Sequence, residues 1–192
     1  MPKQASWMLR KILATQPTWN ELQQPLKAGK SIVRQIYLQL LEYNVRVPWK
    51  CMMFRNAARP KAIFTLWLHI QDRLLTKERL VAWDMDIEPK CIFCDALLET
   101  RDHLFVLKDH PGPVNWNTHL QWLIKSSKGN SQAAQVVKMV YTEGVHAIWI
   151  ERNQRQFEQM SRSVEVVAKE VAVTCNIRAL PGIQQLLRQY IF

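Results

Sequence analysis

The chain has 192 residues, of which 48 % are hydrophobic and only five are glycine, so it can bury a core, and extensive disorder is not expected. Its formal net charge is +10, which favours partners that carry phosphate groups or anionic surfaces. No apolar run approaches the ~18 residues of a membrane helix, and Met1–Ala14 lacks the unbroken apolar block of a secretory signal. We expect an intracellular protein of the nucleus or cytoplasm without a membrane partner; mitochondrial targeting is a minor alternative.

The positive charge is concentrated in the first 50 residues. Met1–Lys50 holds eight Lys or Arg against two acids, whereas Cys91–Asn130 holds four of each. A basic segment of this kind favours binding to the RNA or DNA backbone, although high charge also serves solubility alone. The candidate nucleic-acid-binding residues are Lys3, Arg10, Lys11, Lys27, Lys30, Arg34, Arg46 and Lys50, together with Arg55, Arg59 and Lys61.

Two helices are predicted in the N-terminal segment. Ala5–Leu13 has helical apolar spacing and ends before the first of two prolines. Ser31–Tyr43 repeats this spacing, with Ser31 as its expected N-cap. Tryptophans 7, 19 and 49 could stack on bases, but tryptophan at helical spacing is more often part of a core.

The middle of the chain contains two further predicted helices. Ala62–Ile70 follows Pro60, and its apolar stripe consists of Ile63, Phe64, Trp67 and Leu68. Thr76–Trp83 is a shorter helix with Thr76 as its N-cap.

The C-terminal part is also predicted to be helical. A long helix is expected over Ser131–Phe157, with Gly144 inside it, and another over Ser163–Leu180 with Val166, Val167, Val171 and Ile177 facing inward. Ser126–Gln132, rich in polar residues and glycine, is the expected linker.

Three residues in the middle, Cys91, Cys94 and His103, form part of a pattern typical of a metal site. Cys91 and Cys94 are separated by two residues, a spacing that brings two sulfurs close enough for one zinc ion, and His103 follows. At the usual knuckle spacing, four residues further on, stands Lys108, whose ammonium is not a normal ligand. His110 is the expected fourth ligand, and Asp109 is the alternative. Two interpretations stay open: a zinc site, or reduced cysteines packed beside Phe93 and Phe105 without metal.

The sequence contains no complete catalytic set, so we expect no enzymatic activity. Zinc deaminases combine His-x-Glu with a downstream Pro-Cys-x-x-Cys. Here His69 is followed by Gln71, which cannot shuttle a proton, and Lys90 separates Pro89 from Cys91. Asp84 and Asp86 lack a second acidic cluster with which to hold two metal ions.

A longer series of residues suggests a family. Its members are Pro60, Lys61, Phe64, Trp67, Arg73, Leu74, Thr76, Arg79, Leu80, Trp83, Cys91, Cys94, His103, Leu104 and Phe105. This series resembles the zinc-binding domain that follows the reverse transcriptase in plant LINE-type retrotransposons. Pro48-Trp49, the upstream segment Ser6–Leu13 and the Trp-x-Glu-Arg-Asn element of Ile148–Asn153 resemble its flanks.

The resemblance implies a domain that lies on the C-terminal side of a polymerase. It also implies that this domain binds RNA or target DNA. It also implies a cysteine as the fourth ligand, where this chain has Lys108. Because the polymerase and endonuclease modules are absent from this sequence, we expect a stand-alone fragment derived from such an element.

We therefore expect a mostly α protein with a small zinc-knuckle-like Cys/His segment in its middle. Its parts are a basic helical segment at 1–46, a reverse-transcriptase zinc-binding-like domain at 47–125 and a helical segment at 131–192. The expected function is non-catalytic nucleic-acid binding. The alternative is a protein–protein interaction or assembly module that docks a partner or a second copy through the 131–157 helix.

Overall fold

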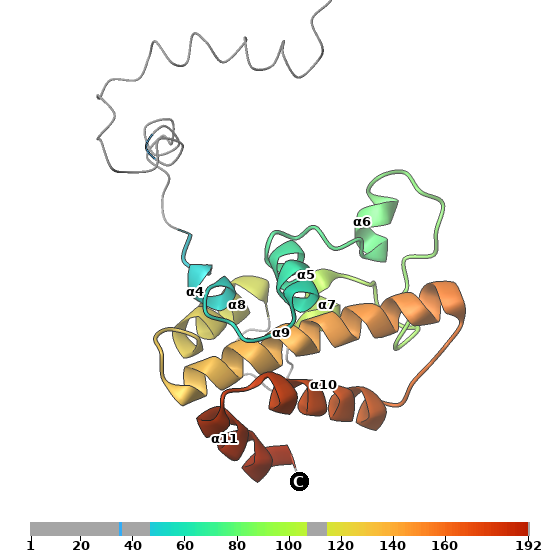
Figure 1. Ribbon diagram of the computed structural model, residues 1–192. Helices are drawn as coiled ribbons and strands as arrows, with labels where there is room; N and C mark the ends of the chain where they lie inside the picture. Colours follow the sequence, from blue (N-terminus) through green and yellow to red (C-terminus); the bar gives the residue numbers. More distant parts are fainter. Residues whose placement is uncertain (1–34, 36–46, 107–114, 192) are drawn as a thin grey trace, which may run out of the picture. The chain divides into compact units, whose positions relative to one another are not determined.

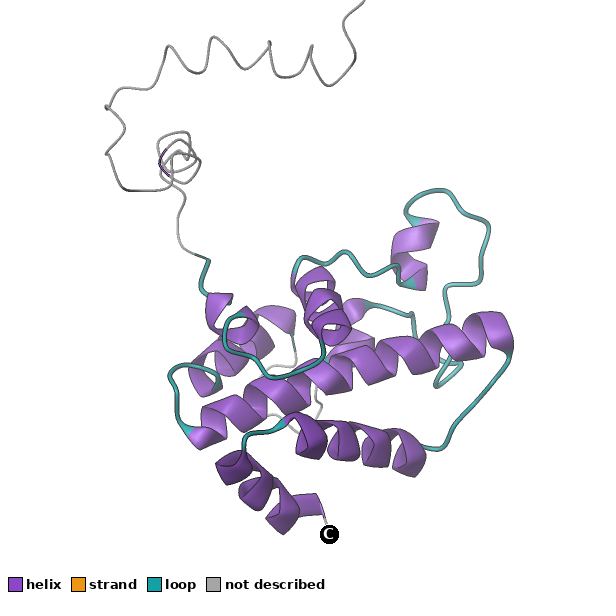
Figure 2. Cartoon of the chain, in the orientation of Figure 1, coloured by secondary structure: helices purple, strands orange, loops and turns teal. Residues whose placement is uncertain are grey.

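The computed structural model describes residues 35, 47–106 and 115–191, with side chains as far as residue 188. Val47–Phe192 form one compact unit, separate from Met1–Arg46. The predicted helix Ala5–Leu13, and all of Ser31–Tyr43 except Gln35, lie outside the described residues. Within the described part the architecture is helical without β-strands (Figure 2), which confirms the predicted fold class.

The longest helix, α9 (Gln132–Asn153), organises the compact unit. One side of α9 packs against α5 (Pro60–Ile70), and the other packs against α10 (Val164–Arg178) and α11 (Pro181–Ile191; Figure 1). The shorter helices α7 (Arg101–Phe105) and α8 (Trp116–Ser126) also contact α9. Two further short helices are α4 (Lys50–Met53) and α6 (Lys77–Val81). The middle and C-terminal parts of the sequence therefore share one framework.

Side-chain caps fix where the main helices begin. The Ser131 hydroxyl accepts a hydrogen bond from the Ala134 amide at the start of α9, and Ser163 does the same for Val166 at the start of α10. These hydroxyls satisfy amides that the first helical turn leaves without partners. Beyond Asn153 the helix continues as one π-helical turn, Gln154–Glu158, and Gln159 then reverses the chain with a φ of 55°.

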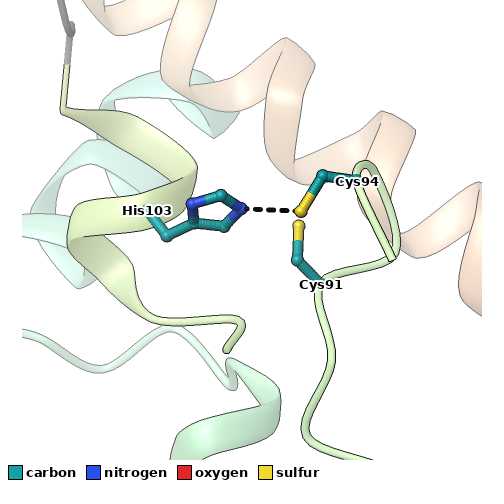
Figure 3. A group of neighbouring side chains, drawn as sticks. All are labelled: Cys91, Cys94 and His103. Carbon is teal, nitrogen blue, oxygen red and sulfur yellow. Dashed lines mark hydrogen bonds between the residues drawn. The ribbon is translucent and has the colours of Figure 1, made fainter. Parts of the chain in front are cut away.

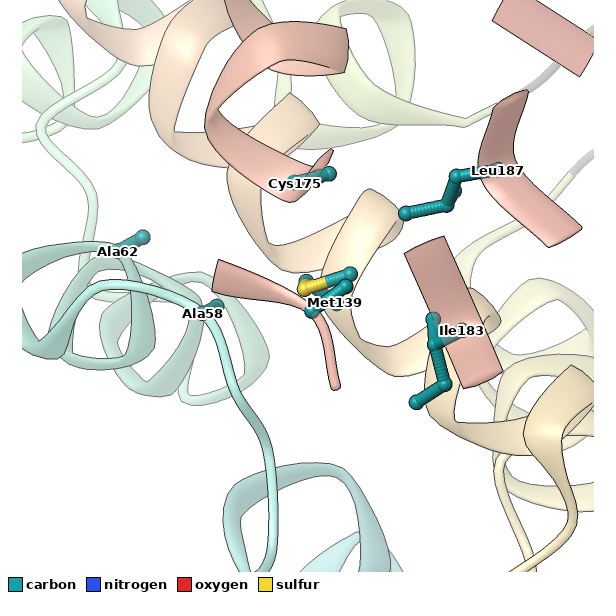
Figure 4. Packing of buried hydrophobic residues seen from close by; sticks show 7 residues of the cluster. Ala58, Ala62, Met139, Cys175, Ile183 and Leu187 are labelled. Carbon is teal, nitrogen blue, oxygen red and sulfur yellow. The ribbon is translucent and has the colours of Figure 1, made fainter. Parts of the chain in front are cut away.

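The largest buried cluster joins α9 to its neighbours on both sides. It contains Ala58, Ala62, Met139, Cys175, Ala179, Ile183 and Leu187, six of which are labelled in Figure 4. The small side chains of Ala58 and Ala62 allow the backbone at the start of α5 to approach α9 closely. Burial raises the pKa of the Cys175 thiol to about 12, so this cysteine is a neutral core residue.

Four predicted helices are present with adjusted ends. Ala62–Ile70 begins earlier, because Pro60 occupies the first helical turn, where its missing N–H costs nothing. Thr76–Trp83 shortens to α6, Ser131–Phe157 corresponds to α9 with its π-helical extension, and Ser163–Leu180 corresponds to α10. Helices α8 and α11 were not predicted from the sequence.

The predicted orientation of two helices was only partly right. Phe64 and Trp67 of the predicted stripe are 60 % and 37 % exposed, while the buried face of α5 contains Ala62, Thr65, Leu66, His69 and Ile70. The buried polar residues have partners, since the Thr65 hydroxyl lies 2.9 Å from His146 Nδ1. On α10, Val166 and Ile177 are exposed and Cys175 is the buried residue. Other members of the two predicted faces do point inward, since Ile63 and Val171 pack against the largest buried cluster, so hydrophobicity alone assigned each face only in part.

Candidate metal centre

Backbone pairing around a tight turn places the two cysteines. The Cys91 amide donates to the Leu97 carbonyl at 2.8 Å, and Lys90 and Leu98 form an antiparallel bridge. Inside this loop the Asp95 amide donates to the Cys91 carbonyl at 2.9 Å, and Asp95 adopts a φ of 51°. Residues 90–98 thus form a knuckle that presents both sulfurs on one side (Figure 3).

His103 approaches the same point from helix α7. The Thr100 hydroxyl caps this helix by accepting the His103 amide hydrogen at 3.0 Å. The ring then reaches the knuckle, with His103 Nε2 3.3 Å from Cys94 Sγ (Figure 3). The ligand atoms of Cys91, Cys94 and His103 all lie within 4.8 Å of one another. Ligands of a tetrahedral zinc ion stand about 3.5–4 Å apart, so this donor set suits zinc.

The described residues offer three candidate ligands, whereas tetrahedral zinc takes four. The fourth ligand expected from the sequence, His110, and its alternative Asp109 lie outside the described residues, as does Lys108. The three-residue group nevertheless has the chemistry of a zinc site, because thiolate and imidazole are the ligands that zinc prefers.

The two cysteines have different surroundings. Cys91 is buried and Cys94 is exposed. Burial raises the pKa of the Cys91 thiol, although amides of the turn, including that of Phe93 at 3.4 Å, act in the opposite direction. Metal binding at such a site releases thiol protons and therefore strengthens as pH rises.

A buried ion pair lies next to the knuckle. Glu99, between Cys94 and His103 in the sequence, accepts hydrogen bonds from Arg152 of α9 at 2.7 and 3.1 Å. The Glu99 side chain is 0 % exposed and that of Arg152 is 2 % exposed. Glu99 was not predicted from the sequence. The feature that could have indicated it is the Trp-x-Glu-Arg-Asn element, whose arginine is Arg152.

Four of the candidate nucleic-acid-binding residues are described. Arg59 forms an ion pair with the buried Glu143 of α9 at 2.8 Å, and its amide also donates to that carboxylate. Arg55 donates to Asn130 at 3.3 Å, the ammonium of Lys50 lies over the Phe54 ring, and Lys61 is exposed at the start of α5. The others lie outside the described residues: Lys3, Arg10, Lys11, Lys27, Lys30, Arg34 and Arg46.

An exposed aromatic pair follows Lys61 on the outer face of α5. The rings of Phe64 and Trp67 are stacked, with centroids 5.9 Å apart and an interplanar angle of 20°. Residues three apart share a helix face, so Lys61, Phe64 and Trp67 form one outward stripe. No residue of α5 is acidic. The stripe therefore combines a positive charge with flat apolar surface. Trp49, one of the tryptophans considered for base stacking, instead packs against a buried cluster.

His69, which the deaminase comparison singled out, belongs to a buried aromatic network. Tyr141 Oη lies 3.1 Å from His69 Nε2 and 3.2 Å from His119 Nε2. The rings of Phe105 and Trp116 each lie 4.5 Å from that of His69. His69 therefore packs in the core, and the histidine of the metal group is His103.

Part of the chain matches a known protein family. Residues 32–109 match the family described as zinc-binding in reverse transcriptase. The matched range includes Cys91, Cys94 and His103, so the three-residue group lies in a region similar to that zinc-binding family. Comparison with curated proteins and with solved structures gave no match. Among the described helices, none combines the length and the apolar character needed to cross a membrane.

Proposed function

We propose that this chain is a zinc-binding, non-catalytic accessory domain derived from the reverse-transcriptase polyprotein of a plant LINE-type retrotransposon, and that it binds RNA or DNA. The observation that carries the proposal is the convergence of Cys91, Cys94 and His103 inside the region similar to the reverse-transcriptase zinc-binding family. The resemblance of the flanking segments supports the LINE-type origin.

In this proposal zinc has a structural role. A bound ion would join the knuckle to α7 by linking the two thiolates to the imidazole, with His110 as the fourth ligand. Structural zinc contributes its binding free energy to local folding. The absence of any complete acid–base or nucleophilic set in the sequence supports a non-catalytic role.

The proposed ligand is a nucleic-acid strand held mainly through its phosphates. Support comes from the excess of six positive charges in Met1–Lys50 and from the outward stripe of Lys61, Phe64 and Trp67. Backbone contacts of this kind are tolerant of sequence, and aromatic faces stack on any base. We place this activity inside the cell, in the nucleus or cytoplasm.

The metal site can be tested by elemental analysis of the purified chain. We expect about one zinc per chain in the wild type and little in Cys91→Ser, with a lower melting temperature for the variant, because structural zinc is coupled to folding. Cys51→Ser is the matched control, since Cys51 lies outside the metal group. A wild-type protein without zinc, and with a melting temperature unchanged by chelator, would contradict the proposal and favour the metal-free interpretation.

A second candidate function is docking of a protein partner. An apolar groove of about 780 Å³ runs between α9 and α10, lined in part by Val136, Val140, Ile148, Val167 and Val171. An amphipathic helix of a partner or a second copy would bury its apolar face there. A mass that rises with protein concentration, without retention of RNA or DNA, would favour this alternative.

A further inference from the structure

The C-terminal end of α9 and the turn that follows it support the knuckle through two separate contacts. One is the ion pair between Arg152 and Glu99, and the other joins Arg155 to Phe93, the residue before Cys94. Both arginines lie beyond residue 109, where the family match ends. The support of the metal site therefore extends outside the matched region.

Glu99 holds the segment that leads from the cysteines to His103. Its amide donates to the Pro89 carbonyl at 2.9 Å, which fixes the base of the knuckle. Its carboxylate oxygen Oε1 accepts from the Lys77 amide at 2.9 Å and from Arg152. The other oxygen, Oε2, is buried and has no partner among the described residues. Arg152 is therefore the only cation that the structure pairs with this buried carboxylate among those residues.

Arg152 is itself held rigidly. Its guanidinium lies 5.2 Å from the centre of the Trp149 ring and donates to Asn153 at 3.0 Å. With its two bonds to Glu99, the buried Arg152 guanidinium makes three hydrogen bonds, so it can hold the segment around Glu99 against α9.

The second contact involves the turn between the cysteines. The Arg155 guanidinium lies 4.9 Å from the centre of the Phe93 ring, and Phe93 donates its amide to Cys91 Sγ. Arg155 is oriented by Glu151 at 2.8 Å, and Glu151 also pairs with Arg162. Burial raises the pKa of Glu151, but hydrogen bonds from Arg162 and Arg155 outweigh this effect and lower it to about 2.

We infer that Arg152 is a positioning residue for the metal site: by pairing with Glu99 it fixes the knuckle relative to α7, so that Cys91, Cys94 and His103 are preorganised for the ion. The inference rests on the proposed zinc site and adds that α9 belongs to it. Residues that orient metal ligands without touching the metal typically contribute 10- to 100-fold in metal affinity.

Removing Arg152 would leave the Glu99 carboxylate buried with one backbone donor. An uncompensated buried charge is unfavourable, so the segment around Glu99 would move toward water. Because this segment connects Cys94 to His103, its displacement would separate the ligands. We therefore expect Arg152→Met to weaken zinc binding by about 10- to 100-fold.

The test measures zinc affinity by competition with a chromophoric chelator and records the cobalt(II) spectrum, whose bands report thiolate ligation. The variants are Arg152→Met, Arg152→Lys and Glu99→Gln. Arg178→Met is the matched control, because Arg178 donates to the Ala57 carbonyl and lies outside the knuckle contacts. We expect weaker binding and an altered cobalt spectrum in Arg152→Met and Glu99→Gln, partial recovery in Arg152→Lys and wild-type affinity in Arg178→Met.

If Arg152→Met does not fold, Glu99→Gln tests whether the ion pair positions the metal ligands. The amide of glutamine has the shape of the carboxylate but removes its charge. A folded Glu99→Gln protein with zinc affinity within twofold of wild type would overturn the inference alone. A wild-type protein that binds no metal would overturn the proposed zinc site and the inference together. Equal losses of affinity in Arg152→Met and Arg178→Met would also overturn the inference, since they would indicate only a general loss of stability.

Discussion

Burial in the protein interior changes the pKa of the His69 side chain strongly. Burial, followed by the positive charge of Arg101 and an interaction with His119, lowers the pKa of His69 from 6.5 to about 3. Burial likewise raises the pKa of Tyr141, which bonds to His69. At neutral pH His69 and Tyr141 are therefore both uncharged.

This lowered pKa predicts acid sensitivity. The unfolded chain takes up a proton at His69 near pH 6.5, whereas the folded chain does so only near pH 3, so stability is full above pH 6.5 and falls as pH decreases through this window. From pH 7 to pH 5 we expect a loss of about 2 kcal/mol from this group. Urea unfolding of the wild type and of His69→Phe at both pH values measures it.

His69→Phe should remove that part of the pH dependence and leave the smaller contribution of His146, whose pKa is also lowered by burial. The range from pH 5 to pH 7 lies above the pKa of Glu151, which is lowered to about 2, so Glu151 does not contribute to this pH dependence. An equal loss of stability in the variant and the wild type would contradict the assignment to His69.

Among individual residues, the candidate metal ligands could be predicted from the sequence, whereas the buried ion pair beside them could not. Cys91, Cys94 and His103 were predicted because their spacing is a local property. Glu99 was not, because its partner Arg152 stands 53 positions away, and only folding shows that the two meet. Arg59 was selected for its charge, and the structure adds that it pairs with Glu143.

Helix α5 has an inner and an outer face of different character. Its inner face packs against α9 with small and hydrogen-bonded side chains, and its outer face presents Phe64 and Trp67. Apolar periodicity predicted the existence of the helix but assigned its face only in part, because the inner face is only partly apolar. Ile63 and Leu68 of the predicted stripe pack against buried clusters, whereas Phe64 and Trp67 do not. Helix α8 was not predicted, although Asn115 caps it and Trp116 and Leu123 are buried.

The outer face of α5 predicts a test of base stacking. Replacing Phe64 and Trp67 together by Ala should weaken binding to single-stranded RNA or DNA by about 1–3 kcal/mol for each stacked base, while the salt dependence stays the same, because no charge is removed. Fluorescence anisotropy with a labelled oligonucleotide measures both quantities. Phe157→Ala, at a site that is 74 % exposed, is the control. Unchanged affinity in the double variant would exclude stacking at this face.

For the whole molecule, the charge distribution predicts electrostatic binding to nucleic acid. Because each neutralised phosphate releases counterions, the logarithm of affinity should fall against the logarithm of salt concentration with a slope of about −0.7 to −0.9 per contact. Between 50 and 200 mM salt, binding should weaken by a factor on the order of 10² or more. Filter binding with Lys27, Lys30 and Arg34 replaced by Ala should show lower affinity and a shallower slope.

The matched control for this charge effect replaces Lys125, Lys128 and Lys169 by Ala. These residues are exposed and lie outside the proposed binding set, so they test the effect of lost charge alone. Equal losses in the two triple variants would indicate non-specific attraction by the net charge. No retention at 50 mM salt by a folded wild-type protein would favour the docking function.

The contact between Arg152 and Glu99 has a consequence for how such a domain can be inherited. A knuckle that ended at residue 109 would carry the buried carboxylate of Glu99 into a new protein without the cation that neutralises it. Recombination that transferred only the matched stretch would therefore be selected against, whereas an exchange that included α9 would keep the site intact. The knuckle and helix α9 should therefore be inherited together. A substitution at Glu99 should be accompanied by a compensating change at Arg152, and the reverse.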